Sequence, residues 1–146
     1  MRRLGGSLSV LSLGLLAGGM LFFPIMTLLL FTRLPLSVAG PFVSGCFPVY
    51  YGYMLVFSAL AGVGFVLRAD YKTALIPWAV SLITVWAWFW MIPQMNADLA
   101  TGNKIAFDRY HTFSTWIDGF EFVVILVLLI REGISSATAK TIHQSF

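Results

Sequence analysis

The chain has 146 residues, of which 59% are hydrophobic and 10% are charged, and its net charge is +3. Soluble domains are only about half apolar, so this composition indicates an integral membrane protein. The length leaves room for one domain and excludes a large soluble one. The basic residues are spread over several segments, so contact with anionic lipid headgroups explains the charge and no nucleic-acid partner is expected.

Four apolar blocks are each long enough to cross a hydrocarbon layer of about 30 Å as a helix. They lie near residues 8–31, 45–67, 74–92 and 111–130. The first block is much longer than the apolar part of a signal peptide, so we expect it to be retained. Continuous runs such as "FVVILVLLI" argue against the alternating strands of a β-barrel. The sequence predicts an all-α, integral membrane four-helix bundle over residues 1–131, followed by a short, flexible polar tail over 132–146.

Basic residues are divided unequally between the two ends of this predicted bundle. Six belong to the end that carries the termini and three to the other end, namely Arg2, Arg3, Arg68, Lys72, Arg131 and Lys140 against Arg33, Lys104 and Arg109. Since loops rich in Lys and Arg stay in the cytoplasm, we expect both termini there. The expected location is the inner (cell) membrane of a bacterium.

Two connections between the spans carry structural signals. Pro35, Gly40 and Pro41 follow the first span closely, which predicts that its helix stops and that a short segment lies along the outer interface. The segment between the third and fourth spans holds most of the exposed polar residues. It is predicted to be the longest loop and the main external contact surface, with room for a short helix.

Gly14 and Gly18 form a pair of small residues four positions apart, a spacing that lets helix backbones approach closely in lipid. The pair predicts tight packing of the first span on a neighbouring helix. We expect this neighbour within the same bundle, and a homodimer is the alternative. Cys46 is the only cysteine, so an intrachain disulfide and a multi-cysteine metal site are excluded.

The fourth span carries acidic residues, which are costly inside a membrane. Helical spacing places a polar stripe on one face and large apolar residues on the other, so we expect the stripe to face the interior. It comprises Phe107, His111, Ser114, Asp118 and Glu121. Glu121 lies about 15 Å from His111 along the helix, near the middle of a ~30 Å layer. No Lys or Arg falls inside a predicted span, so Glu121 must contact polar groups or water, or be protonated.

Two interpretations of the stripe remain open. In one, its polar groups hydrogen-bond across helices and set the register of the bundle. In the other, Asp118 and Glu121 bind a cation or relay protons, with His111 and Arg109 at the entrance. The hydroxyl groups on other spans that could serve Glu121 as partners belong to Tyr50, Tyr51, Tyr53, Ser58, Ser81 and Thr84.

Several short motifs carry a family resemblance. In chain order, "LFFP", "CFPVYYGY", "IP" and "FDRYHTFSTWIDG" resemble the small four-span membrane proteins of the domain-of-unknown-function family 4149, relatives of transmembrane protein 205. The resemblance covers most of the chain, and its motif positions include Phe47, Pro48, Tyr50 and Phe107. It implies the four-helix membrane architecture. In the family an asparagine stands where this chain has Asp118, and an ionised aspartate accepts hydrogen bonds but cannot donate them.

No pattern in the sequence indicates an enzyme. There is no nucleotide-binding loop or zinc-type cluster, and His111, Ser114 and Asp118 stand side by side on one helix, which leaves no room for a substrate between nucleophile and base. No metal or cofactor is predicted.

The preferred function is an accessory or scaffold subunit of a larger membrane complex, with other membrane proteins or a second copy as partners. The alternative is a small transporter or channel for a proton, cation or small solute that uses the polar stripe. Haem or pigment binding is a third interpretation. Because His111 is the one histidine in the spans, a bis-histidine haem within one chain is not expected.

Overall fold

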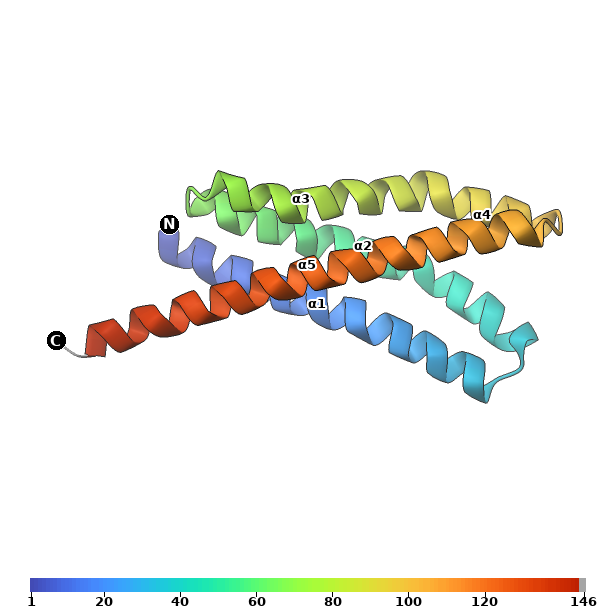
Figure 1. Cartoon of the computed structure of the whole chain (residues 1–146), viewed down its shortest axis with the longest axis horizontal. Coiled ribbons are helices and arrows are strands. Elements are labelled where there is room, and N and C mark those ends of the chain that lie inside the picture. Colours follow the sequence, from blue (N-terminus) through green and yellow to red (C-terminus); the bar gives the residue numbers. More distant parts are fainter. Residues whose placement is uncertain (145–146) are drawn as a thin grey trace.

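The computed structural model describes the backbone of residues 1–144 and the side chains of residues 1–135 except that of Arg2. All regular structure in this range is helical. In chain order the helices are α1 (Arg2–Arg33), α2 (Leu36–Leu67), α3 (Tyr71–Trp86), the π-helix η1 (Ala87–Met91), α4 (Ile92–Ala100) and α5 (Lys104–Gln144). Because α3, η1 and α4 join end to end, they form one rod (Figure 1). Four rods are thus long and apolar enough to cross a membrane, which confirms the all-α membrane architecture.

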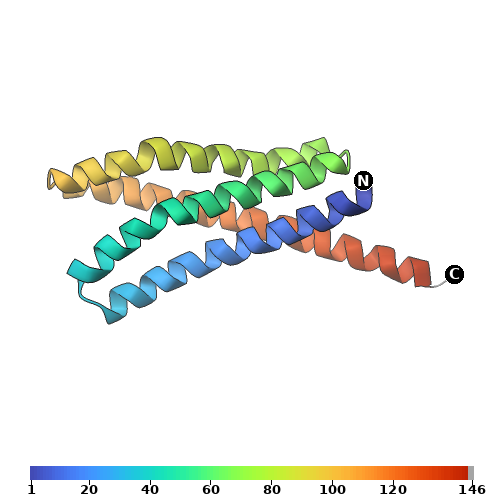
Figure 2. The same ribbon diagram turned by 180° about the vertical axis from the view of Figure 1, so that it is seen from behind.

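The rods alternate in direction, so both termini lie at one end of the bundle (Figure 1). α2 packs against both α1 and α3, while α5 packs against α1 and α4. At the end opposite the termini, the α1–α2 hairpin and the α4–α5 hairpin diverge, as the view from behind also shows (Figure 2). The cytoplasmic position of the termini stays a prediction.

The connection between the first two spans differs from the prediction. Only Leu34 and Pro35 separate α1 from α2, and Pro41 lies inside α2. The extended backbone of Pro35 turns the chain by itself, and membrane helices tolerate internal proline because neighbouring groups satisfy the freed carbonyl. The predicted interfacial segment was therefore wrong.

The segment between the third and fourth spans is not the predicted long loop, although the short helix for which it has room is present as α4. α4 continues the third rod to Ala100, and α5 begins after a turn of three residues, 101–103. Gly102 supplies the left-handed conformation of this turn, with φ 72°, and the Asn103 side chain accepts a hydrogen bond from the Ala106 N–H. These are ordinary signals for ending one helix and starting the next. The polar residues consequently lie on helix ends.

α5 is longer than the predicted fourth span and continues from Glu132 to Gln144. The predicted flexible tail is therefore wrong for residues 132–144, which are helical. The side chains of Lys140 and His143, and residues 145 and 146, lie outside the described residues.

Glycines permit the closest approach of α1 and α2 near the end that carries the termini. A Cβ atom on Gly64 would lie 2.6 Å from the backbone nitrogen of Ser9, and one on Gly5 would lie 2.7 Å from the carbonyl oxygen of Gly64. Neither glycine can accept a side chain without moving the helices apart. The α1–α2 crossing therefore depends on Gly5 and Gly64.

Gly14 and Gly18 do not form such a contact. A Cβ atom on either would meet nothing within 4 Å, so the predicted tight packing of this pair within the bundle was wrong. Both glycines instead line a cavity between α1 and α2. The spacing of two glycines identifies a face that permits close approach, but the position of the crossing decides which glycines use it. The homodimer alternative stays a prediction.

Candidate functional site

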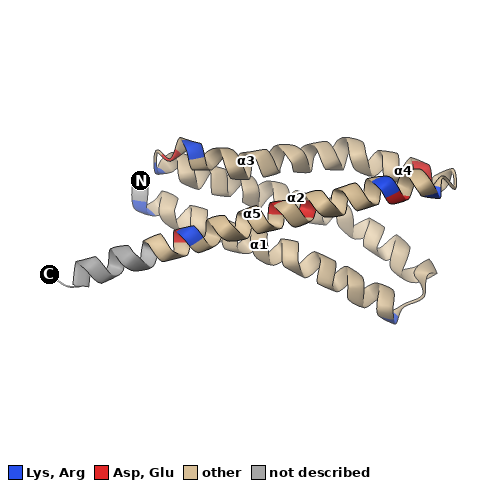
Figure 3. Ribbon diagram, viewed as in Figure 1, with Lys and Arg blue, Asp and Glu red and all other residues tan. Residues whose placement is uncertain are grey.

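The acidic residues of the polar stripe lie in the middle part of the bundle on α5, whereas the coloured basic segments lie toward the two ends of the bundle (Figure 3). Glu121 is only 4% exposed and Asp118 is partly buried. Large apolar side chains on the opposite face are exposed, among them Phe113, Trp116, Phe120, Val123 and Val127. The structure thus turns both acids toward the bundle and the apolar face toward the surroundings, in agreement with the cost of exposing carboxylates to lipid.

Glu121 has an unsatisfied oxygen. Its Oε1 atom is buried and has no hydrogen-bond partner in the described part of the chain. The ion pairs among the described residues involve Asp70, Asp108 and Glu132, and none involves Glu121. A charged carboxylate without a partner is strongly disfavoured in a medium of low dielectric constant. The geometry therefore calls for a proton, a cation or water at this oxygen.

Two tyrosines of α2 interact electrostatically with the acids. Tyr50 and Tyr51 are both buried and lie within electrostatic range of Asp118 and Glu121. A tyrosine hydroxyl can donate a hydrogen bond to a carboxylate or supply an oxygen lone pair to a cation. We call these four residues the central acid site. It has two carboxylates, and among the described residues no three His, Cys, Asp or Glu side chains are placed to hold a metal ion.

The other hydroxyl groups predicted as partners of Glu121 are engaged elsewhere. Tyr53 donates to a backbone carbonyl of α1, and Thr84 donates to a carbonyl of its own helix. Ser58 of α2 and Ser81 of α3 share a hydrogen bond of 2.7 Å between their oxygen atoms. This last hydrogen bond links two helices, as expected for the polar stripe, but it joins α2 to α3 and does not involve the stripe on α5.

The part of the stripe nearest the start of α5 does not join the central acid site. Ser114 is buried and donates a hydrogen bond of 2.8 Å to the carbonyl of His111. His111 is exposed and its ring packs against Phe107 with 5.7 Å between ring centres. Arg109 is exposed as well. These residues lie toward the end where the two hairpins diverge, so the inward stripe begins at Ser114 and not at His111.

Aromatic residues of the second-span motif join α1 to α2 beside the central acid site. Phe23 stacks on Tyr50 with 4.1 Å between ring centres, and its ring meets Phe47 edge-on at 5.3 Å. Phe47 also stacks on Tyr51 at 5.9 Å. Pro48 is exposed on α2. Aromatic packing of this kind holds the two tyrosines in place.

A second polar cluster, at the end that carries the termini, was not predicted from the sequence. Arg68, at the end of α2, forms an ion pair with Glu132 of α5 and donates to the Ser9 hydroxyl of α1 over 3.3 Å. Glu132 is only 4% exposed. We call this the end network, and its further members are Asp70, Thr73 and Arg131. These residues belong to different helices, and the periodicity of a single helix contains no signal that they meet.

Asp70 begins α3 within the end network. Its side chain accepts a hydrogen bond from the Thr73 backbone N–H, as expected of a residue that caps a helix. Partial burial favours the neutral acid, but the hydrogen bonds from Thr73 and the charges of Arg131 and Arg68 outweigh it and lower the pKa of Asp70. Asp70 is therefore a charged group that couples the start of α3 to α5.

Comparison with known protein families matches residues 11–104 to the family described as Domain of unknown function (DUF4149). The match covers more than half of the chain, from α1 to the first residue of α5. No curated protein and no solved structure matches the chain. The two acids of the central site lie on α5, beyond the matched residues.

Proposed function

The chain belongs to the DUF4149 family, and from this premise we propose that it is a non-catalytic membrane carrier or channel whose central acid site takes up a proton or a small cation. The family description names no activity, so the proposal rests on the site. One observation carries it: the buried Oε1 atom of Glu121 has no hydrogen-bond partner among the described residues. Acids inside membrane spans commonly mark ion or proton pathways.

The arrangement of the acids supports uptake of a single positive charge. Asp118 lies three positions before Glu121, so the two carboxyl groups share one face of α5 and repel each other when both are ionised. A proton or a monovalent cation removes this repulsion and supplies the missing partner. Tyr50 and Tyr51 of α2 lie within electrostatic range of both acids. Ser114 continues the buried face of α5 beyond the acids, and the exposed His111 lies one turn further toward the end of the bundle.

Flux measurements in proteoliposomes test this proposal. Vesicles that contain the purified protein and an internal pH-sensitive dye are given a membrane potential, and uptake of protons, Na⁺ and K⁺ is followed. We expect uptake above that of empty vesicles, and we expect Glu121→Gln to abolish it because the amide cannot exchange a proton or balance a cation charge. The matched control is Asp108→Asn, which changes an exposed acid of the same helix that pairs with Lys104 outside the central site.

Two results would contradict the carrier proposal. One is uptake no faster than that of empty vesicles for all three ions. The other is equal uptake by the native protein and Glu121→Gln, with far-UV circular dichroism showing that both are folded. In the latter case Glu121 would be a structural residue, held protonated or hydrated, as in the register-setting interpretation.

A second function is favoured by the exposed apolar half of α2. Where the two hairpins diverge, Leu36, Phe42 and Val49 are all more than half exposed. A membrane protein packed against this surface would make the chain an accessory or scaffold subunit, the function preferred from the sequence. Blue-native electrophoresis of mildly solubilised native membranes tests it. Migration only as a monomer or homo-oligomer would contradict an accessory role.

The proposal includes a location in the inner membrane of a bacterium with both termini in the cytoplasm. Arg3, Arg68, Lys72 and Arg131 belong to the end that carries the termini, and this supports the orientation through the positive-inside rule. A reporter enzyme active only outside the cytoplasm, fused after the C-terminus, is expected to be inactive. An active fusion would reverse the orientation.

A further inference from the structure

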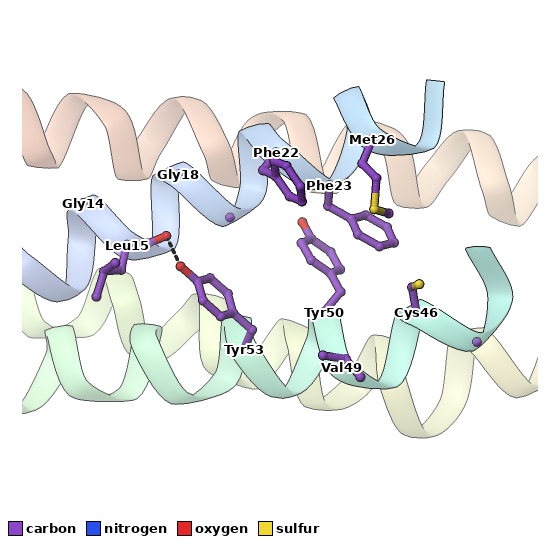
Figure 4. A pocket seen from close by; sticks show the side chains of 12 residues that line it. Gly14, Leu15, Gly18, Phe22, Phe23, Met26, Cys46, Val49, Tyr50 and Tyr53 are labelled. Carbon is purple, nitrogen blue, oxygen red and sulfur yellow. Dashed lines mark hydrogen bonds between the residues drawn. The ribbon is translucent and has the colours of Figure 1, made fainter. Parts of the chain in front are cut away.

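A cavity of about 610 Å³ opens between α1 and α2 (Figure 4). Its walls are almost entirely apolar. Gly14, Gly18 and Gly45 expose bare backbone to it, since a Cβ atom on any of them would meet nothing within 4 Å. Phe22 and Phe23 contribute aromatic walls. This volume and lining are typical of sites for small organic molecules, which measure about 300–1,000 Å³ and are mainly apolar with few polar groups.

One of the two tyrosine hydroxyl groups that line the cavity is free to bind a ligand. Tyr53 and Tyr50 both line the cavity, and Tyr53 donates its hydroxyl to the carbonyl of Leu15. Tyr50 is 7% exposed, and no hydrogen bond engages its hydroxyl among the described residues. The hydroxyl points from α2 toward α1, beside Phe22 and Phe23 (Figure 4). This oxygen is not among the fully buried atoms without a partner in the described residues, so it is open to the cavity and can donate a hydrogen bond to an acceptor bound there.

We infer that this cavity binds a lipid-soluble ring compound that carries a hydrogen-bond acceptor such as a carbonyl. The ring lies against the aromatic walls, and the acceptor takes the hydroxyl hydrogen of Tyr50. The molecule enters from the bilayer, because α1 and α2 are both membrane-spanning helices. This inference concerns the α1–α2 side of Tyr50 and does not depend on ion uptake at Glu121.

Two other occupants satisfy the cavity less well. A saturated acyl chain fills apolar space but offers no acceptor to Tyr50 at this depth. A second copy that packs symmetrically on the exposed pair Gly14 and Gly18 brings glycine against glycine. Such packing closes the distance between backbones but supplies no large side chain to fill about 610 Å³. The chemistry of the lining therefore favours the ring compound.

Cys46 provides a direct measure of occupancy, because this sole cysteine lines the cavity and its sulfur is directed toward α1 (Figure 4). The rate at which N-ethylmaleimide modifies Cys46 is measured in nanodiscs with increasing decylubiquinone, a ring compound with two carbonyl groups and no free ring position for thiol addition. We expect saturable protection. Tetradecane, which has neither ring nor acceptor, is expected to protect far less.

Two pairs of variants test separately the hydrogen bond donated by Tyr50 and the free volume of the cavity. Tyr50→Phe is expected to weaken decylubiquinone protection about two- to tenfold, the loss for one hydrogen bond. Tyr71→Phe, at an exposed tyrosine of α3, is the matched control and should leave it unchanged. Gly18→Leu fills the cavity and should abolish protection, whereas Gly119→Leu, on an open face of α5, should retain it.

Several results would overturn the inference. Absence of saturable protection by decylubiquinone is one, and equal protection by tetradecane, which would assign the cavity to acyl chains, is another. A third is a dimer, detected by native mass spectrometry, that shields Cys46 without added compound and dissociates in Gly18→Leu. Because no result depends on flux, failure of this inference is distinguishable from failure of the carrier proposal.

Discussion

Replacing Gly64 by alanine tests the crossing of α1 and α2. The added Cβ atom would lie 2.6 Å from the backbone nitrogen and 2.9 Å from the Cα atom of Ser9. Backbone atoms cannot rotate away, so the helices must move apart. Overpacking costs about 1–3 kcal/mol, and contact with backbone argues for the upper end, while the better helix propensity of alanine returns about 1 kcal/mol. We expect Gly64→Ala to lower the free energy of unfolding by about 2 kcal/mol.

Gly14→Ala is the matched comparison, because its Cβ atom would meet nothing within 4 Å. This variant keeps the propensity gain without the clash, so its stability should be unchanged or up to about 1 kcal/mol higher. Both free energies are measured by titrating detergent-solubilised protein with sodium dodecyl sulfate and following far-UV circular dichroism. Equal stability of Gly64→Ala and the native protein would refute the crossing as described, and so would a larger loss in Gly14→Ala.

Three further predictions concern single polar contacts. Glu132→Gln should destabilise the protein by about 3 kcal/mol in the same titration, because it leaves the partly buried Arg68 without its counter-charge. A change in stability near zero would contradict the end network. Asp70→Ala should cost about 1 kcal/mol at neutral pH through loss of the cap. Because the folded protein lowers the pKa of Asp70, the stabilisation by its carboxylate is fully present above the ordinary pKa of 3.8. It should be lost as the pH falls through the lowered pKa. A stability difference between Asp70→Ala and the native protein that persists in acid would contradict a contribution from the ionised carboxylate. Tyr53→Phe should lower the free energy of unfolding by about 1 kcal/mol, because it removes a hydrogen bond between α2 and α1. Tyr50→Phe should lower it less when no ring compound is added to the detergent solution. A larger loss in Tyr50→Phe than in Tyr53→Phe would contradict these contacts.

The helical architecture could be predicted from the sequence because lipid offers no hydrogen bonds to a backbone. A long apolar run must then satisfy its own N–H and C=O groups, and a helix does so. The need to satisfy backbone hydrogen bonds within the helix also explains why the predicted helix boundaries were wrong. Pro41 and the polar residues before Thr101 are typical of breaks in soluble proteins, but here the helices continue through them.

The side of α5 on which the acids lie could also be predicted, because one helix with 3.6 residues per turn fixes the relative angles of its own side chains. Asp118 and Glu121 therefore share a face opposite Phe120 whatever the helix packs against. How far along the helix that face stays covered could not be predicted. His111 is exposed and Ser114 is buried only because of where the neighbouring hairpin turns away.

Contacts between helices depended on the tertiary structure alone. The sequence by itself determined a four-helix membrane protein with two acids on one face of its last span. The crossing at Gly5 and Gly64, the cavity beside Gly14 and the pairing of Arg68 with Glu132 were decided by the tertiary structure. Each depends on the rotation and axial position of one helix relative to another, and the periodicity of a single helix contains neither quantity.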